Sequence, residues 1–136
     1  MKADEDYFAL FDLKLIAGKL FAKSDTATGY VVNETFLKKV NIANPQDAVG
    51  KMINSTGVNI PIIGVIKDFN DLSLKDNISG LTISPGKTSY WRAAVKLDTK
   101  QLFTADKKVE ELWNSLFPDQ IYSSNFVNES INSQYE

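Results

Sequence analysis

The sequence predicts an α+β fold with a mixed, mainly antiparallel sheet and two or three packed helices. Asn59–Lys67 is rich in Ile and Val at successive positions, which is typical of a strand covered on both faces. Ala105–Phe117 carries apolar residues at helical spacing. Ser55–Gly57 and Pro85–Gly86 are turn signals between strands, and they favour hairpins over strict β-α-β alternation.

The N-terminal third predicts two short helices and two short strands. Acidic residues precede the apolar run Tyr7–Phe11, an order typical of a helix start. Apolar alternation over residues 13–15 predicts a strand. Tyr30–Val32 predicts a second strand, and Asn33 is a suitable N-cap for a helix over Glu34–Val40.

The middle of the chain predicts a hairpin around the central strand. Asn44–Pro45 opens a short helical turn, Gln46–Val49, which Gly50 ends. Lys51–Asn54 then pairs with Asn59–Lys67 as a hairpin. Within the second strand we expect Gly64 at a bulge or beside a closely packed neighbour, because it has no Cβ.

The C-terminal third predicts one more clear helix. Residues 91–98 alternate between apolar and polar, which indicates a half-exposed strand. Thr104 caps the helix Ala105–Phe117, whose expected core stripe is Val109, Leu112, Trp113, Leu116 and Phe117. Further elements are predicted at Leu81–Ile83 and Tyr122–Val127 (strands) and at Asn128–Glu136 (the start of a helix). With no linker or repeat, residues 1–136 are predicted to form a single domain.

Composition excludes several classes of function. The chain has 136 residues, 43% hydrophobic and 24% charged, with a net charge of −2 and no electrostatic footprint for nucleic acid. It shows no apolar run long enough to span a membrane and no signal-peptide pattern. With zero Cys and zero His, it lacks disulfides, thiolate or imidazole catalysis and Cys- or His-based metal sites. We therefore expect no metal and no cofactor, and the side chains that remain for any chemistry are carboxylates, Lys, Tyr and Ser.

Four local patterns have simpler explanations than a functional site. The oxygen-rich stretch Asp68–Ser73 fails the spacing of a calcium loop and is explained by turn capping. Gly50–Lys51 lacks the earlier glycine of a phosphate loop. Ser73 and Lys75 would form a Ser–Lys dyad only if the lysine were desolvated. Four Asn-X-Ser/Thr triplets are expected by chance in an Asn- and Ser-rich chain.

The loop after the central strand is the predicted contact surface. Phe69 and Tyr90 neighbour turn residues, and an exposed aromatic on a loop indicates a contact, whereas a buried Phe69 would serve as a lid over the sheet edge. A loop held at the end of a rigid strand has a defined position, as a contact or relay requires. The candidate residues are Asp68, Phe69, Asn70, Asp71, Leu72, Tyr90 and Trp91.

Four motifs in order resemble the extracytoplasmic region of the MacB/FtsX-like ABC transporter permeases. The matching segments are Asp6–Phe21 ("D-x-Y-F…G-R-x-F"), Tyr30–Thr35 ("V-V-N-E-T"), Asn44–Lys51 ("N-P-x-x-A-I-G-K") and Ile63–Phe69 ("I-I-G-V-V-K-D-F"). Phe126–Glu136 is similar to the lead-in to that family's second transmembrane helix. The family's transmembrane helices are absent, so the resemblance implies an excised segment of a longer permease.

The resemblance implies a MacB periplasmic-domain-like fold and a non-catalytic role on the periplasmic side of the bacterial cytoplasmic membrane. Such a domain would relay conformational change and contact substrates or partners during export, lipoprotein release or cell-wall signalling. Its implied partners are a cytoplasmic ABC ATPase acting through the full-length permease, a second permease subunit, and a periplasmic adaptor, lipoprotein or peptide. A free-standing peptide- or lipid-binding module is the alternative, and a carboxylate enzyme would need two facing carboxylates in a cleft.

Overall fold

The computed structural model describes residues 1–55, 57–69 and 77–125, and the chain divides into two compact units after Ala93. The first unit holds the sheet. Its strands are β1 (Leu15–Gly18), β2 (Tyr30–Asn33), β3 (Met52–Ser55), β4 (Val58–Ile66) and β5 (Thr82–Ile83). Its helices are α1 (Tyr7–Leu10), α2 (Glu34–Lys39) and the short 3₁₀ turns η1 (Pro45–Ala48) and η2 (Lys87–Ser89). The second unit holds η3 (Thr99–Gln101) and α3 (Leu102–Leu116). The single-domain organisation of residues 1–136 stays a prediction.

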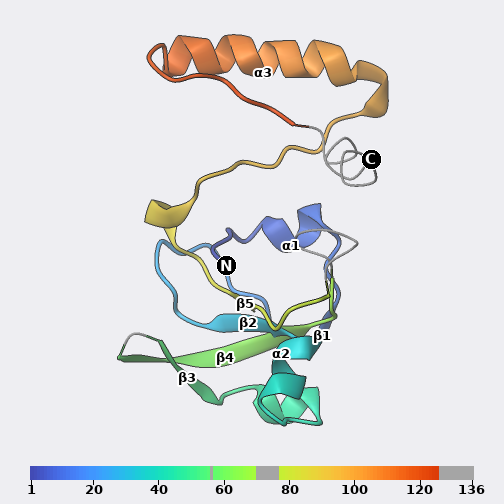
Figure 1. Cartoon of the computed structure of the whole chain (residues 1–136), viewed down its shortest axis with the longest axis vertical. Helices are drawn as coiled ribbons and strands as arrows, with labels where there is room; N and C mark the ends of the chain where they lie inside the picture. The colour runs from blue at the N-terminus through green and yellow to red at the C-terminus, as the bar shows by residue number, and fades with distance from the viewer. Residues whose placement is uncertain (56, 70–76, 126–136) are drawn as a thin grey trace. The chain divides into compact units, whose positions relative to one another are not determined.

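β4 is the central strand of the sheet (Figure 1). β1 and β3 pair with it antiparallel, β2 pairs with it parallel, and β5 continues the sheet antiparallel to β2. Three of the four pairings are antiparallel, and the described residues form three α-helices, two of them in the unit that holds the sheet. The predicted α+β class with a mixed, mainly antiparallel sheet is therefore confirmed, as is the hairpin of β3 and β4.

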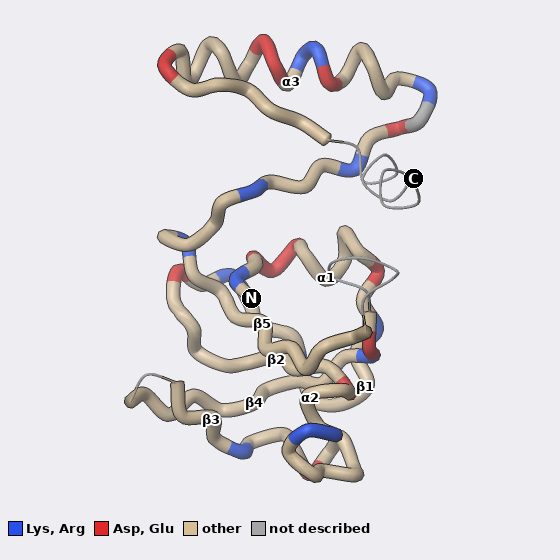
Figure 2. Tube along the Cα trace, in the orientation of Figure 1, with Lys and Arg blue, Asp and Glu red and all other residues tan. Residues whose placement is uncertain are grey.

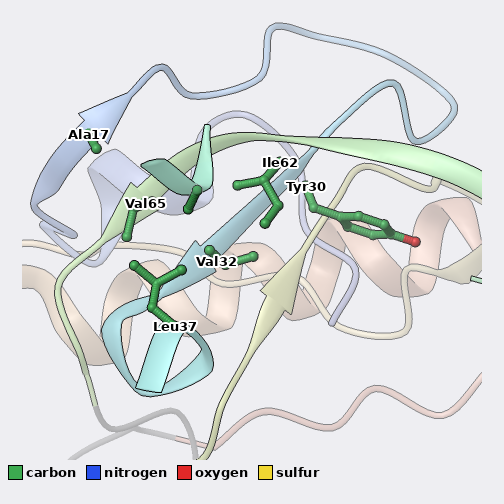
Figure 3. Close-up of a cluster of buried hydrophobic side chains, with 7 residues drawn as sticks. Ala17, Tyr30, Val32, Leu37, Ile62 and Val65 are labelled. Carbon is green, nitrogen blue, oxygen red and sulfur yellow. The ribbon is translucent and has the colours of Figure 1, made fainter. Parts of the chain in front are cut away.

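Two apolar clusters cover the two faces of the sheet. The α2-side cluster, drawn in Figure 3, consists of Ala17, Tyr30, Val32, Leu37, Ala48, Ile62 and Val65. The α1-side cluster consists of Ala3, Phe8, Phe21, Val31, Ile66 and Ile83. Consecutive residues along β2, and likewise along β4, thus point into opposite clusters, as strand geometry requires. The successive apolar residues at the end of β4 are explained by this two-sided burial.

Two glycines let the chain after β1 approach β4 closely. A Cβ on Gly64 would lie 2.2 Å from the Lys19 carbonyl oxygen, and a Cβ on Gly18 would lie 2.2 Å from the Ile63 carbonyl oxygen. Gly18 also has φ +70°, a conformation that glycine adopts without steric cost. The register with β2 shifts beside Gly64, between Tyr30 and Val31. Of the two alternatives expected at Gly64, the closely packed neighbour is present, and the register irregularity falls at the preceding residue, Ile63.

The predicted strand over residues 91–98 is wrong. Tyr90–Asp98 has no regular secondary structure, and Trp91 and Val95 are exposed. An alternating pattern becomes a strand only where a neighbouring strand completes its backbone hydrogen bonds. No strand pairs with this segment in the described part of the chain. The predicted strand Tyr122–Val127 is likewise absent over residues 122–125, and its last two residues and the helix Asn128–Glu136 lie outside the described residues.

α3 is present, but its predicted core stripe is not buried within its own unit. The side chains of Leu112 and Leu116 are 60% and 61% exposed. Around Trp113 the chain does fold back on the helix: its ring lies 4.9 Å from that of Phe117 and 6.3 Å from that of Tyr122. The Tyr122 hydroxyl donates a 2.7 Å hydrogen bond to Asp106. An amphipathic stripe shows which face can be buried, and a covering surface has to be supplied by other residues.

Candidate functional site

Parallel strands β2 and β4 end at the same edge of the sheet, and this edge is the candidate site. β2 leads directly into α2, and β4 leads into Lys67–Phe69. Asn33 pairs with Ile66 in the parallel register, so the residues that follow each strand are neighbours. We call this place the strand-end site and define it by Asn33, Glu34, Thr35, Asp68 and Phe69.

Asp68 is bonded to the first turn of α2. Its carboxylate accepts hydrogen bonds from the Thr35 backbone N–H and from the Thr35 hydroxyl, both at 2.8 Å. In return, the Glu34 carboxylate accepts a 3.0 Å hydrogen bond from the Asp68 backbone N–H. A carboxylate at a helix N-terminus also interacts favourably with the helix dipole. The three bonds fasten the segment after β4 to the start of α2.

Asn33 fastens a third segment to the same place. Its side chain is almost completely buried, and its Oδ1 accepts hydrogen bonds from Phe36 N at 3.0 Å and from Leu81 N at 2.8 Å. Its Nδ2 donates a 2.8 Å hydrogen bond to the Ser79 carbonyl oxygen. Asn33 is therefore the N-cap predicted from the sequence and also a clamp on residues 79–81. A buried amide with its polar atoms bonded stabilises one arrangement of these segments.

Lys38 adds a weak electrostatic contact. Its Nζ lies 3.5 Å from Asp68 Oδ2, but the lysine side chain is 73% exposed and that of Asp68 is 17% exposed. Ion pairs with one solvated partner contribute little to stability. Elsewhere, positive and negative residues are interspersed along the trace (Figure 2). Among the described residues no three acidic side chains gather as metal ligands would, and no helix is both long and apolar enough for a membrane span.

Phe69 is half-buried and packs against the α1-side cluster. Asp68 and Phe69 thus lie at the strand-end site with their side chains engaged inside the unit. The three candidates that follow them, Asn70, Asp71 and Leu72, lie outside the described residues. This placement corresponds to the alternative reading of Phe69 as a lid over the sheet.

Tyr90 and Trp91 lie on a separate segment, after η2. The Tyr90 hydroxyl donates to the Ala3 carbonyl oxygen and accepts from Gly86 N, both at 3.2 Å. Trp91 has no such partner in the described chain and is 89% exposed. Of the described candidates, Trp91 is therefore the side chain most available for contact. An indole left in water is unusual, since a tryptophan in a folded protein is highly buried on average.

Sequence reasoning missed Glu34 and Thr35 as site residues. Both lie in the segment Tyr30–Thr35, which was singled out only as a motif, and both contact Asp68 from the other distinctive motif, Ile63–Phe69. The signal available was the presence of two polar motifs after two predicted strands. Parallel pairing of those strands was needed to join them, and the sequence did not reveal that pairing.

The fold is a mixed sheet around the central β4, with α1 beside one apolar cluster and α2 beside the other. The chain is similar to the periplasmic region of MacB from Actinobacillus actinomycetemcomitans, with a TM-score of 0.58 and 21% identity over 83% of this chain. It is also similar to a domain of a protein described as a permease from Porphyromonas gingivalis, with a TM-score of 0.52 and 16% identity over 94% of this chain. No family model and no curated protein sequence matches the chain.

These likenesses confirm, at the level of the fold, the resemblance predicted from the sequence. The match spans 54% of the MacB periplasmic region and 69% of the Porphyromonas gingivalis domain. The chain thus corresponds to about half of the MacB region it matches.

Proposed function

We propose that the chain is a non-catalytic extracytoplasmic domain of an ABC transporter permease. The observation that supports this proposal is the MacB-like fold, found together with the four permease-like motifs in order. Two of those motifs are bonded to each other at the strand-end site, so the motifs support the same architecture as the fold. The domain would lie on the periplasmic side of the bacterial cytoplasmic membrane, as part of a longer protein that crosses it.

In this role the strand-end site would transmit movement between segments. Asp68 is hydrogen-bonded to α2, and Asn33 connects the start of α2 with residues 79–81, so a displacement of one segment would be passed to the other two. The contact surface would be the loop from Asp68 to Leu72 with Tyr90 and Trp91. Its partners would be a periplasmic adaptor, lipoprotein or peptide, while a cytoplasmic ABC ATPase and a second permease subunit would act through the full-length permease.

Topology in the full-length protein tests the proposal. The chain contains no cysteine, so Thr26→Cys at an exposed loop position adds the single cysteine of this segment, and any cysteines elsewhere in the full-length protein are first replaced by serine. In intact cells with a permeabilised outer membrane, a membrane-impermeant maleimide should label this cysteine in the membrane fraction. Labelling that requires lysis, or a protein found in the soluble fraction, would contradict the proposal.

Transport in the full-length protein tests the contact surface. We expect Trp91→Ala to reduce transport or partner binding without lowering the thermal midpoint, because the exposed indole is available to a partner. Ile121→Ala, at another exposed apolar residue, is the matched control and should retain activity. Phe69→Ala should also reduce activity, and full activity in both Trp91→Ala and Phe69→Ala would place the contact elsewhere.

A free-standing extracytoplasmic module that binds a peptide or lipid is the second candidate. The same exposed Trp91 would serve such a module equally well. The two candidates differ in the gene product: transmembrane helices flanking these residues support the permease and exclude the module.

A further inference from the structure

The outer edge of β3 carries unpaired backbone groups. The Lys51 carbonyl oxygen accepts from Ile62 N, and Gly50 N donates to the Ile62 carbonyl oxygen, both at 2.8 Å, so the backbone before β3 faces β4. Because backbone groups alternate along a strand, Ile53 also faces β4, whereas the N–H and C=O of Met52 and Asn54 face outward. Pro61, opposite Met52, has no N–H to offer, which agrees with this alternation.

This edge is open to solvent. β3 pairs with β4 alone in the part of the chain that the structure describes, and Met52 and Asn54 are both exposed. Met52 is 64% exposed, a high value for a large apolar side chain in a strand. An exposed strand edge is a template for another extended backbone, because its donors and acceptors repeat at the strand spacing.

A shallow apolar hollow borders the same strand. Its volume is about 300 Å³, and it is lined by Phe36, Val40, Ile42, Ile62 and residues 51–53. Phe36, Ile42 and Ile53 also pack against the α2-side cluster, so the hollow lies on that face of the sheet. In strand addition, pockets beside the edge receive alternate side chains of the added peptide.

Lys51 supplies the charge at this hollow. Its residue lines the hollow and is exposed, and no salt bridge to it is present among the described residues. A carboxylate on the added peptide, two residues from the one that enters the hollow and therefore on the same face of the strand, would be attracted to the ammonium group. Such a rim contact contributes to selectivity more than to affinity.

We propose that the outer edge of β3 binds an extended peptide by antiparallel strand addition, with an apolar side chain in the hollow and a carboxylate two residues further on, on the same face, near Lys51. Met52 and Asn54 provide the backbone hydrogen bonds, and Phe36, Val40 and Ile42 receive the side chain. The inference does not depend on the permease assignment, because a free-standing binding module could use the same edge. The occupant is a segment of another protein; a second copy of this chain is one outcome of the test below.

The test uses the 136-residue chain and a synthetic peptide probe. The probe is the acetylated, amidated heptapeptide T-V-T-L-T-D-T. The control is the same peptide with N-methylated threonines on either side of leucine, which cannot complete the ladder because those are the residues whose N–H groups would face β3. Titration into the ¹⁵N-labelled chain should shift the backbone amide signals of Met52 and Asn54, with weaker or no shifts for the control. No binding of the probe up to about 1 mM, equivalent to about −4 kcal/mol, would overturn the proposal.

Three variants separate the parts of the proposed site. Met52→Pro removes an outward N–H at an edge position where proline is tolerated, and it should weaken binding about tenfold at an unchanged thermal midpoint. Val40→Asp places a charge in the hollow and should abolish binding, whereas Val109→Asp, at an exposed position on α3, is the matched control and should not. Lys51→Glu should reverse the preference between the aspartate probe and its lysine counterpart.

The remaining outcomes also decide the question. Undiminished binding by both Met52→Pro and Val40→Asp, or shifts confined to residues outside β3, would overturn the proposal. A concentration-dependent dimer that Met52→Pro abolishes would assign the edge to a second copy of the chain instead. If Met52→Pro fails to fold, the amide shifts and the Lys51→Glu preference still test the site.

Discussion

Gly64 shows how one missing side chain shapes the sheet. The Lys19 carbonyl oxygen lies 2.2 Å from the place where a Cβ on Gly64 would stand, far inside van der Waals contact. The obstacle is backbone, which cannot rotate away as a side-chain end can. The chain leaving β1 and the middle of β4 can therefore approach each other only while this position is glycine.

Gly64→Val should destabilise the chain by about 1–3 kcal/mol, as overpacking does. Urea unfolding followed by circular dichroism measures this change. Gly57→Asn is the matched control: Gly57 has φ +85° and nothing within 4 Å of a Cβ, and asparagine tolerates that conformation. An unchanged midpoint for Gly64→Val would show that β1 and β4 do not meet as described.

Asp68→Ala should destabilise the chain by about 2–4 kcal/mol, because it removes both hydrogen bonds to Thr35 and leaves partly buried donors without an acceptor. Thr35→Val should cost about 1–2 kcal/mol, since only the hydroxyl bond is lost. Lys38→Ala, at the exposed ion pair, should cost less than about 1 kcal/mol.

A double-mutant cycle on Thr35 and Asp68 checks that the two residues act on each other. The combined variant should cost less than the sum of the single ones, because the Asp68→Ala change already removes the hydroxyl's acceptor. Strict additivity would mean that the two side chains act independently in solution. The hydrogen bond between Thr35 and Asp68 would then not hold the strand-end site together.

The elements that the sequence predicts correctly are those marked by residues within the element itself. The features that depend on contact with residues far along the chain are not predicted. The β-branched run of β4 and the Asn33 cap of α2 are local, and both appear within a residue or two of the expected bounds. Residues 91–98 have an equally clear alternation but form no strand. The bonds between Glu34, Thr35 and Asp68 join residues more than 30 positions apart, and no periodicity reports such a contact.

The segment that follows α3 folds back along the helix, where the Tyr122 hydroxyl donates a hydrogen bond to Asp106 that depends on pH. The hydrogen bond donated to Asp106 raises the pKa of Tyr122 above its ordinary value near 10, and a hydrogen bond with Ser124 opposes that rise. The bond stabilises the protonated tyrosine, so its contribution is fully present below pH 10. It is lost as the pH rises through the raised folded-state pKa.

Asp106→Asn should lower the pKa of Tyr122 toward the ordinary value, because it removes the charged acceptor. Absorbance titration at alkaline pH measures this, with Tyr122→Phe subtracted to isolate the one tyrosine. Asp119→Asn, an acidic residue outside this contact, should leave the titration unchanged. An identical titration in the chain and in Asp106→Asn would show that the bond does not persist in solution.

At the scale of the molecule, the chain should bind neither metal ions nor nucleotides. The expectation follows from the absence of His and Cys and of a phosphate loop. Thermal shift with Ca²⁺, Zn²⁺ and ATP–Mg²⁺ measures it, because a ligand at 100-fold over its Kd adds about 2.7 kcal/mol. A Ca²⁺ response that Asp68→Ala abolishes would reveal a calcium loop at residues 68–73.

The division of the chain after Ala93 makes a last prediction about how stability is distributed. Both apolar clusters draw all their members from residues 3–83, and all five strands lie in the same part of the chain. α3, in contrast, has no buried residue. Because stability comes chiefly from buried apolar surface, residues 1–93 should hold nearly all of it. The fragment 1–93 should therefore fold alone, with a urea midpoint close to that of the whole chain. A fragment that is unfolded, or less stable by several kcal/mol, would show instead that residues 94–136 complete a single domain. The Gly64→Val variant of the fragment is the internal check, since its loss of stability should equal that in the whole chain.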